Sequence, residues 1–169
     1  GDAQAPDVQA LTALCSATAR EVGAHLTQWR RERSSVASDT KSGPTDVVTA
    51  ADREAESMIR TRLLAAYPDA AWWGEESGRS AGTVDASGAD LEWVVDPIDG
   101  TVNFLYDLPG WSVSIAAVWR GDVVGAAVMV PTTATLFSAS SGMGAWLDDA
   151  GGRRRLAVSS CTELSQALV

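Results

Sequence analysis

The spacing of apolar residues changes once along this chain, and that change limits the folds available to it. From about residue 7 to 31, and again from about 49 to 68, apolar side chains recur every three or four residues, as they do on one face of a helix. From residue 92 onward the period is two, and glycine-rich turns separate the runs, which is typical of hairpins. Two long helices followed by hairpins predict an α+β fold, with the helices packed on an antiparallel sheet.

The expected strands are short, and the expected boundaries come from turn residues. A capping-box pattern at Thr49–Asp52 marks the start of the second helix and places Asp52 at its third position, where a carboxylate stabilises a helix without doing chemistry. Residues 78–90 are expected to form a surface loop, and residues 163–169 to enter a further strand. The remaining strands are expected at residues 92–95, 112–119, 123–130, 135–140, 144–147 and 154–158.

Length, charge and cysteine content restrict the class of protein. The 169 residues are enough for one domain with its own core, which we expect to span residues 1–169. The net charge of −9 argues against a nucleic-acid partner, and no apolar run is long enough to predict a membrane span. Cys15 and Cys161 stand far apart and match no metal-ligand pattern, so we expect reduced thiols in a cytoplasmic protein.

Two short acidic blocks carry the chemistry that the sequence predicts. Glu75 and Glu76 follow an apolar run and a glycine, and Asp96 ends a second apolar run. Pro97 is expected to stop that strand from continuing as a paired central strand. A tight turn can then bring Asp99 beside Asp96, so that both carboxylates face one point.

The residues after this turn suit an anion. Gly100 lets the backbone approach a ligand closely, and residues 101–105 can form a short helix with free N–H groups at its start. Oxygen ligands without Cys or His favour Mg²⁺, then Mn²⁺, over Zn²⁺. Either acidic block alone is more typical of an ordinary turn or a solvated loop, but both together predict a Mg²⁺-dependent phosphatase site.

Both blocks match a known family. The run WVVDPIDGTVNF at residues 93–104 and GEES at residues 74–77 resemble the signature blocks of the inositol monophosphatase family, and residues 41–52 resemble the segment before its second helix. The resemblance implies an αβαβα layered sandwich, of which this chain would be the N-terminal part. The family also has a metal-binding aspartate after a tryptophan in a C-terminal half. Residues 146–148 lie in the hairpin region and do not replace it, so we expect the chain alone to turn over poorly.

The resemblance also implies a set of metal ligands. Glu75, Asp96 and the main-chain carbonyl of Ile98 would bind the first Mg²⁺, and Asp96 and Asp99 would share a second. Glu75 would help to hold a third, weaker ion, and Lys41 would lie near the mouth of the site.

The implied catalytic and substrate-binding roles fall on neighbouring residues. Asp99 and the amides of Gly100 and Thr101 would contact the phosphate. Thr101, oriented by Asp52, would position the attacking water, and Glu76 would act next to the metal ligands or through water. The implied substrate is a small phosphorylated polyol, first of all myo-inositol 1-phosphate. Histidinol phosphate, 3′-phosphoadenosine 5′-phosphate and fructose 1,6-bisphosphate are alternatives. A homodimer and inhibition by Li⁺ are implied as well.

Two other functions stay open at this point. A haloacid-dehalogenase-type phosphatase needs Asp-x-Asp, with the first aspartate as nucleophile, whereas two residues separate Asp96 from Asp99. A metal-binding or interaction module that keeps the fold without turnover is the non-enzymatic alternative.

Overall fold

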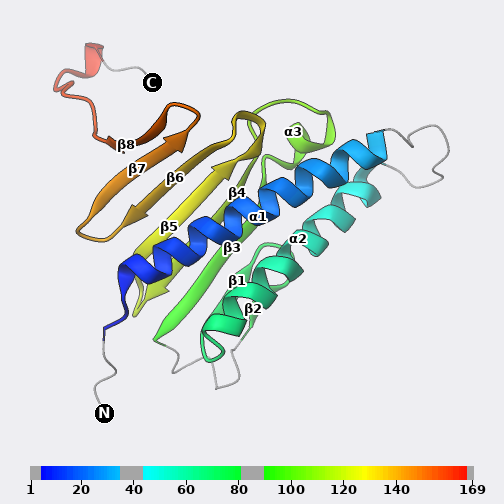
Figure 1. The fold of residues 1–169 in the computed structure, drawn as a ribbon, viewed down its shortest axis with the longest axis horizontal. Helices are drawn as coiled ribbons and strands as arrows, with labels where there is room; N and C mark the ends of the chain where they lie inside the picture. Colours follow the sequence, from blue (N-terminus) through cyan, green and yellow to red (C-terminus); the bar gives the residue numbers. More distant parts are fainter. Residues whose placement is uncertain (1–4, 35–43, 81–89, 167–169) are drawn as a thin grey trace.

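Two long helices cover one face of an eight-stranded sheet. The computed structural model describes residues 5–34, 44–80 and 90–166. Helices α1 (Val8–Ser34) and α2 (Pro44–Ala66) run side by side across the sheet (Figure 1). The strand order is β2-β1-β3-β4-β5-β6-β7-β8. The strands are β1 (Ala71–Gly74), β2 (Gly78–Ser80), β3 (Leu91–Asp99), β4 (Ser112–Trp119), β5 (Asp122–Val130), β6 (Thr135–Ser140), β7 (Gly144–Asp149) and β8 (Gly152–Leu156).

Helix α2 begins earlier than the sequence pattern predicts. It starts at Pro44 rather than near Thr49, and proline suits the first helical position because its missing N–H would have no partner there. Asp52 therefore lies inside the helix, and the capping-box explanation of its carboxylate is wrong. Asp52 is also buried, with only 4% of its surface exposed. A buried acid within a helix requires another explanation.

Most of the hairpin region agrees with the prediction. Strands β4 and β6 have the predicted bounds, as does the short helix α3 (Thr101–Leu105). Strand β3 continues to Asp99, but its pairing with β4 shifts between Asp96 and Asp99, so Pro97 lies in a β-bulge.

Other boundaries differ from the prediction as well, and β7 ends at Asp149 instead of Leu147 while α1 ends at Ser34 instead of near Arg31. Residues 78–80 form strand β2 instead of a loop, because they pair with β1, while residues 81–89 lie outside the described part. Strand β8 begins at Gly152, directly after the turn, instead of Arg154. Residues 164–166 form a 3₁₀ turn, η3, instead of entering a strand. A second 3₁₀ turn, η2 (Pro131–Thr133), joins β5 to β6.

The sheet is mixed rather than purely antiparallel. Strand β1 pairs parallel with β3, with Gly74 opposite Val95, and the other neighbouring pairs are antiparallel. Parallel neighbours end at the same edge of a sheet. The residues that follow β1 and those that end β3 are therefore brought together, although about twenty positions separate them in the sequence.

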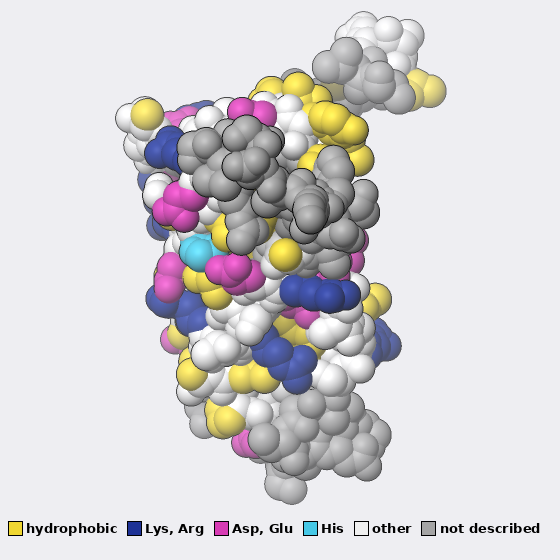
Figure 2. Space-filling view, turned by 90° about the vertical axis from the view of Figure 1, so that its right-hand side faces the viewer, with side chains coloured by type: hydrophobic (Ala, Val, Ile, Leu, Met, Phe, Trp, Pro, Cys, Tyr) yellow, Lys and Arg dark blue, Asp and Glu magenta, His cyan; other side chains and the backbone are white. Residues whose placement is uncertain are grey.

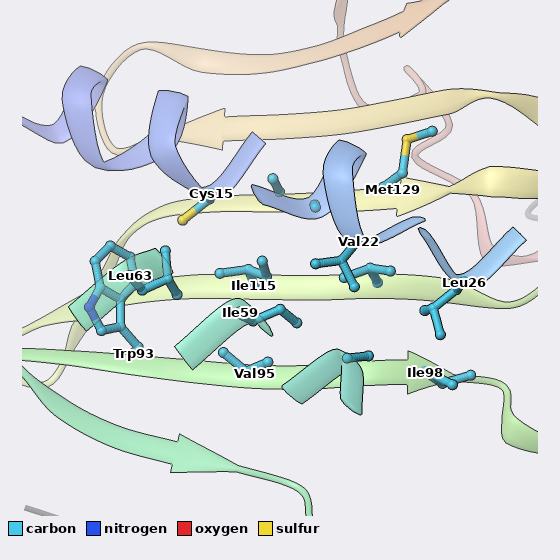
Figure 3. Close-up of a cluster of buried hydrophobic side chains, with 14 of the residues drawn as sticks. Cys15, Val22, Leu26, Ile59, Leu63, Trp93, Val95, Ile98, Ile115 and Met129 are labelled. Atoms are coloured by element: carbon cyan, nitrogen blue, oxygen red, sulfur yellow. The ribbon is translucent and has the colours of Figure 1, made fainter. Parts of the chain in front are cut away.

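The hydrophobic core lies between the two helices and the sheet (Figure 3). Every second residue of β3, β4 and β5 points into it, and α1 and α2 contribute residues three or four apart. This packing fixes α2 against the end of β3, where the acidic residues gather. The labelled core residues in Figure 3 are Cys15, Val22, Leu26, Ile59, Leu63, Trp93, Val95, Ile98, Ile115 and Met129.

Among the described helices, none is both long enough and apolar enough to cross a membrane.

Candidate metal and phosphate site

The parallel pairing of β1 with β3 brings the two acidic blocks together. The Glu75 amide donates a hydrogen bond to the Val95 carbonyl at 3.1 Å, which continues the pairing one residue beyond β1. Glu75 and Asp96 consequently lie side by side at the ends of the two strands. The Glu75 carboxyl group is close enough to that of Asp96 to raise the Asp96 pKa.

Burial and the nearby negative charges raise the pKa of Asp96. Burial raises the pKa of Asp96 to about 7, and the neighbouring Glu75 carboxyl group and the charge of Asp99 act in the same direction. The Ile98 amide opposes them, because it donates to Asp96 Oδ1 at 3.1 Å and stabilises the carboxylate. Such crowding is what a bound cation would relieve.

Asp52 joins this cluster from helix α2. Burial is the largest of the causes that raise the pKa of Asp52 to about 7. The negative charges of Glu76, Glu75, Asp96 and Glu56 raise this pKa as well. The structure thus gathers acids from α2, from the residues after β1 and from the end of β3 into one electrostatic cluster.

Three contacts shape the turn between β3 and α3. The Thr101 hydroxyl donates to the Ile98 carbonyl at 3.1 Å, and the Ser112 hydroxyl donates to Asp99 Oδ2 at 3.4 Å. Gly100 adopts a left-handed conformation with φ 88°. A Cβ atom at Gly100 would lie 2.8 Å from the Gly110 carbonyl oxygen, so both its φ and its surroundings require glycine.

The start of α3 leaves amides available for an anion. The first helical hydrogen bond runs from the Phe104 amide to the Gly100 carbonyl at 3.0 Å, so the amides of Gly100 and Thr101 precede the bonded part of the helix. Asn103 Nδ2 donates to the Gly110 carbonyl at 2.9 Å, and the Phe104 ring packs edge-on against Trp111 with 4.9 Å between centroids. These contacts hold α3 against the loop that precedes β4.

Sequence reasoning missed Glu56. This side chain is 4% exposed, and its carboxylate accepts the amides of Glu76 at 2.8 Å and Ser77 at 3.1 Å. A signal was present, because Asp52 and Glu56 are four residues apart and flank the core-facing Ala55. Two acids at that spacing beside an apolar stripe indicate a buried polar function rather than a solvated face.

The donor set suits Mg²⁺. The carboxylates of Glu75, Asp96 and Asp99 and the carbonyl of Ile98 are hard oxygen ligands of the kind that Mg²⁺ prefers. In the described part of the chain, no group of three or more His, Cys, Asp or Glu side chains is already arranged around one point in a form that could hold an ion. The chemistry of the ligands therefore fits, while their final arrangement stays a prediction.

The other predicted residues have mixed outcomes. Glu76 belongs to the cluster by its charge on Asp52, and its carboxylate also lies 4.0 Å from Nε of the exposed Arg53. The hydroxyl of Thr101 is bonded to Ile98, so its orientation by Asp52 stays a prediction. Lys41 lies outside the described residues. On the side of the molecule where α1 ends and α2 begins, acidic and basic side chains are interspersed with uncharged surface (Figure 2).

The sequence model of the Inositol monophosphatase family matches residues 7–169. The chain belongs to the inositol monophosphatase family. Relatives include the inositol-1-monophosphatase SuhB of Mycobacterium tuberculosis, which is 43% identical over 129 residues, covering 76% of this chain and 44% of the relative. The Nus factor SuhB of Pseudomonas aeruginosa is 42% identical over 138 residues, covering 82% of this chain and 49% of the relative.

Solved structures agree with this assignment. The structure of Mycobacterium tuberculosis SuhB gives a TM-score of 0.75 at 32% identity, over 95% of this chain and 56% of the other. The inositol monophosphatase from Anabaena gives a TM-score of 0.75 at 27% identity, over 95% of this chain and 54% of the other. The chain therefore has the N-terminal part of the family fold and spans about half the length of the relatives it matches. The family is one of Mg²⁺-dependent phosphomonoesterases.

Proposed function

We propose that the protein hydrolyses a small phosphate monoester with Mg²⁺, with myo-inositol 1-phosphate as the first candidate substrate. The observation that carries the proposal is the meeting of Glu75 and Asp96 at the ends of parallel strands, with Asp52 buried beside them. Family membership supports it. Histidinol phosphate and nucleotide 3′-phosphates stay alternative substrates, and the homodimer stays a proposal.

The residues of this chain would bind and orient the reactants. Glu75, Asp96, Asp99 and the Ile98 carbonyl would hold the metal, which supplies Lewis-acid stabilisation of phosphoryl charge and lowers the pKa of water. The amides of Gly100 and Thr101 would receive the phosphate oxygens at the start of α3.

Asp52 and Thr101 would handle the proton of the attacking water. Asp52 is buried within the acidic cluster, and its carboxylate is a proton acceptor of the kind that general-base catalysis uses. The Thr101 hydroxyl can donate to one acceptor while accepting from water with its lone pairs. We therefore assign Thr101 to positioning the water, and Asp52 to accepting its proton through Thr101 or directly.

The test is phosphate release from myo-inositol 1-phosphate and from histidinol phosphate during a Mg²⁺ titration. It compares this chain with one extended to the length of its relatives. We expect activity in the extended chain and a loss on the order of 100-fold in Asp96→Asn, because that change removes a shared ligand charge. Asp122→Asn, at the exposed start of β5, is the matched control and should keep full activity. Full Mg²⁺-dependent turnover in Asp96→Asn would refute the proposal.

A non-catalytic interaction module is the second candidate. It is favoured by a relative of similar identity whose name is Nus factor SuhB. In that case the extended chain would bind metal and release no phosphate from any of the candidate substrates.

A further inference from the structure

We propose that Glu56 is a positioning residue, whose buried carboxylate fixes the backbone of residues 75–77 so that the Glu75 side chain is presented beside Asp96. The anchoring is a property of this chain alone, and its consequence for metal binding rests on the proposed function.

Glu56 is bound in a way that suits an anchor. Its two carboxylate oxygens accept different amides, Oε2 from Glu76 at 2.8 Å and Oε1 from Ser77 at 3.1 Å. Within the described part of the chain, no ion pair includes Glu56. A buried carboxylate without a cation is unfavourable unless its hydrogen bonds compensate. The two charge-assisted bonds to backbone amides supply that compensation.

Gly74 makes the approach of Glu56 feasible. A Cβ atom at position 74 would lie 2.5 Å from both Cδ and Oε1 of Glu56, closer than real side chains pack. Gly74 is also the last residue of β1, directly before the proposed ligand Glu75. The glycine of the GEES block is therefore explained by room for the Glu56 carboxylate rather than by an unusual backbone angle.

The backbone around Glu75 is held on both sides. The Glu75 amide is bonded to the Val95 carbonyl at 3.1 Å, and the next two amides are bonded to Glu56. The Ser77 hydroxyl accepts the indole N–H of the fully buried Trp72 at 3.0 Å. With these contacts in place, rotation of the Glu75 side chain is the main freedom left, so its carboxylate stays next to Asp96.

Glu56 also ties the turn to the helix that carries Asp52. The two acids are one helical turn apart on the buried side of α2. A single rigid helix thus supplies Asp52 to the acidic cluster and, through Glu56, fixes the distance from that helix to the turn. Because the turn that carries Glu75 is already held in place, less of its backbone would have to become ordered when a metal binds.

The first measurement is hydrogen exchange of the Glu76 and Ser77 amides in the metal-free chain. We expect exchange at least about ten times faster in Glu56→Ala, because both amides lose their acceptor. Glu56→Gln keeps one acceptor oxygen and should lie between wild type and Glu56→Ala. Glu54→Gln removes a charge from the same helix but leaves both bonds, and should match wild type. Unchanged exchange in a folded Glu56→Ala chain would overturn the anchoring.

The second measurement is Mn²⁺ binding, followed by the electron paramagnetic resonance signal of the free ion. We expect roughly tenfold weaker binding in Glu56→Ala and a smaller loss in Glu56→Gln, since a ligand on a mobile turn must first be ordered. Gly74→Ala displaces the carboxylate but keeps its charge, and it should also weaken binding. Equal losses in Glu56→Gln and Glu56→Ala, with none in Gly74→Ala, would show a pure charge effect and overturn the positioning role.

The two measurements separate this inference from the proposed function. If the wild-type chain binds no Mn²⁺, the proposed metal site fails, and the exchange rates still decide whether Glu56 anchors the turn. If Mn²⁺ binds and neither Glu56 variant weakens it, the metal site stands and the positioning role is overturned. Thermal unfolding confirms that each variant is folded, and Gly74→Ala serves in place of Glu56→Ala if the latter does not fold.

Discussion

Asp52 is buried and Asp96 is half-buried among other acids, and each has a pKa raised to about 7, chiefly by loss of solvation. The usual value for an aspartic acid is 3.8. Between these values the folded chain keeps protons that the unfolded chain has released. The acidic cluster therefore opposes folding in the absence of metal, and a cation or a proton would relieve it.

A pH dependence of stability follows at this scale. The free energy of unfolding of the metal-free chain should fall as pH rises from about 4 to about 7, because the folded state binds more protons there. Asp52→Asn, which stays neutral, should gain on the order of 1 kcal/mol over wild type at pH 8 and little at pH 4. Urea unfolding with chelator at both pH values measures this. The same slope in wild type and Asp52→Asn would contradict the assignment.

Gly100 gives a second prediction for a single residue. Gly100→Ala should lower the free energy of unfolding by about 2 kcal/mol or more, because alanine is strained at φ 88° and its Cβ would overlap the Gly110 carbonyl oxygen. Gly78→Ala is the matched control, since φ is 71° there and nothing lies within 4 Å of the added atom. The loss of stability in Gly78→Ala therefore measures the strain of alanine at a positive φ without any steric overlap. A Gly100→Ala loss no larger than that of Gly78→Ala would show that the close approach is unimportant.

At the scale of elements, the spacing of apolar residues predicted those helices and strands whose formation depends on the local sequence. Helices α1 and α3 and strands β4 and β6 follow from apolar spacing and turn residues, and the structure confirms them. The start of α2 was missed because Pro44 begins a helix as readily as it ends one. The parallel pairing of β1 was missed because a four-residue strand shows no period that identifies its partner.

The prediction of the candidate site likewise rests on local patterns. The acidic blocks are local in sequence, so their residue types and turn chemistry indicated cation and phosphate binding. The role of Glu56 depends on a contact twenty residues away in sequence and on the missing side chain of Gly74. In the sequence, the only sign of such a contact is the four-residue spacing of Asp52 and Glu56 along the helix, which is weak evidence by itself.

The contact between α1 and β5 supports a prediction for these elements. A Cβ atom at Gly125 would lie 2.5 Å from Thr12 Oγ1 and 3.3 Å from the Thr12 amide nitrogen. Gly125→Val should therefore push α1 away from the sheet and cost about 1–3 kcal/mol in urea unfolding. Val123→Thr, on the same strand at a side chain that is 60% exposed, should change stability by less than about 0.5 kcal/mol. Similar values for both variants would contradict this account of the packing.

At the scale of the whole molecule, the two faces of the sheet differ in cover. Helices α1 and α2 lie on one face (Figure 1). On the opposite face, partly exposed apolar residues of neighbouring strands pair with one another and form a row. Next to this row, the exposed Phe137 pairs with Val128. The row consists of Val94, Ala116, Ala126, Ala139, Ala145 and Leu156. A second apolar layer would be expected to cover such a face.

This face supplies a test of how the chain relates to its longer relatives, of which it spans about half. If their remaining half covers the row, Val128→Glu should cost about 3 kcal/mol or more in a chain extended to that length, because the carboxylate would be buried without a partner. In the present chain the same position is partly exposed, so the cost should stay below about 1 kcal/mol. Val123→Glu, at the exposed start of β5, controls for added charge in both lengths. Urea unfolding of the four variants and their parents gives the comparison, and an equal, small cost of Val128→Glu in both lengths would mean that the added half packs elsewhere.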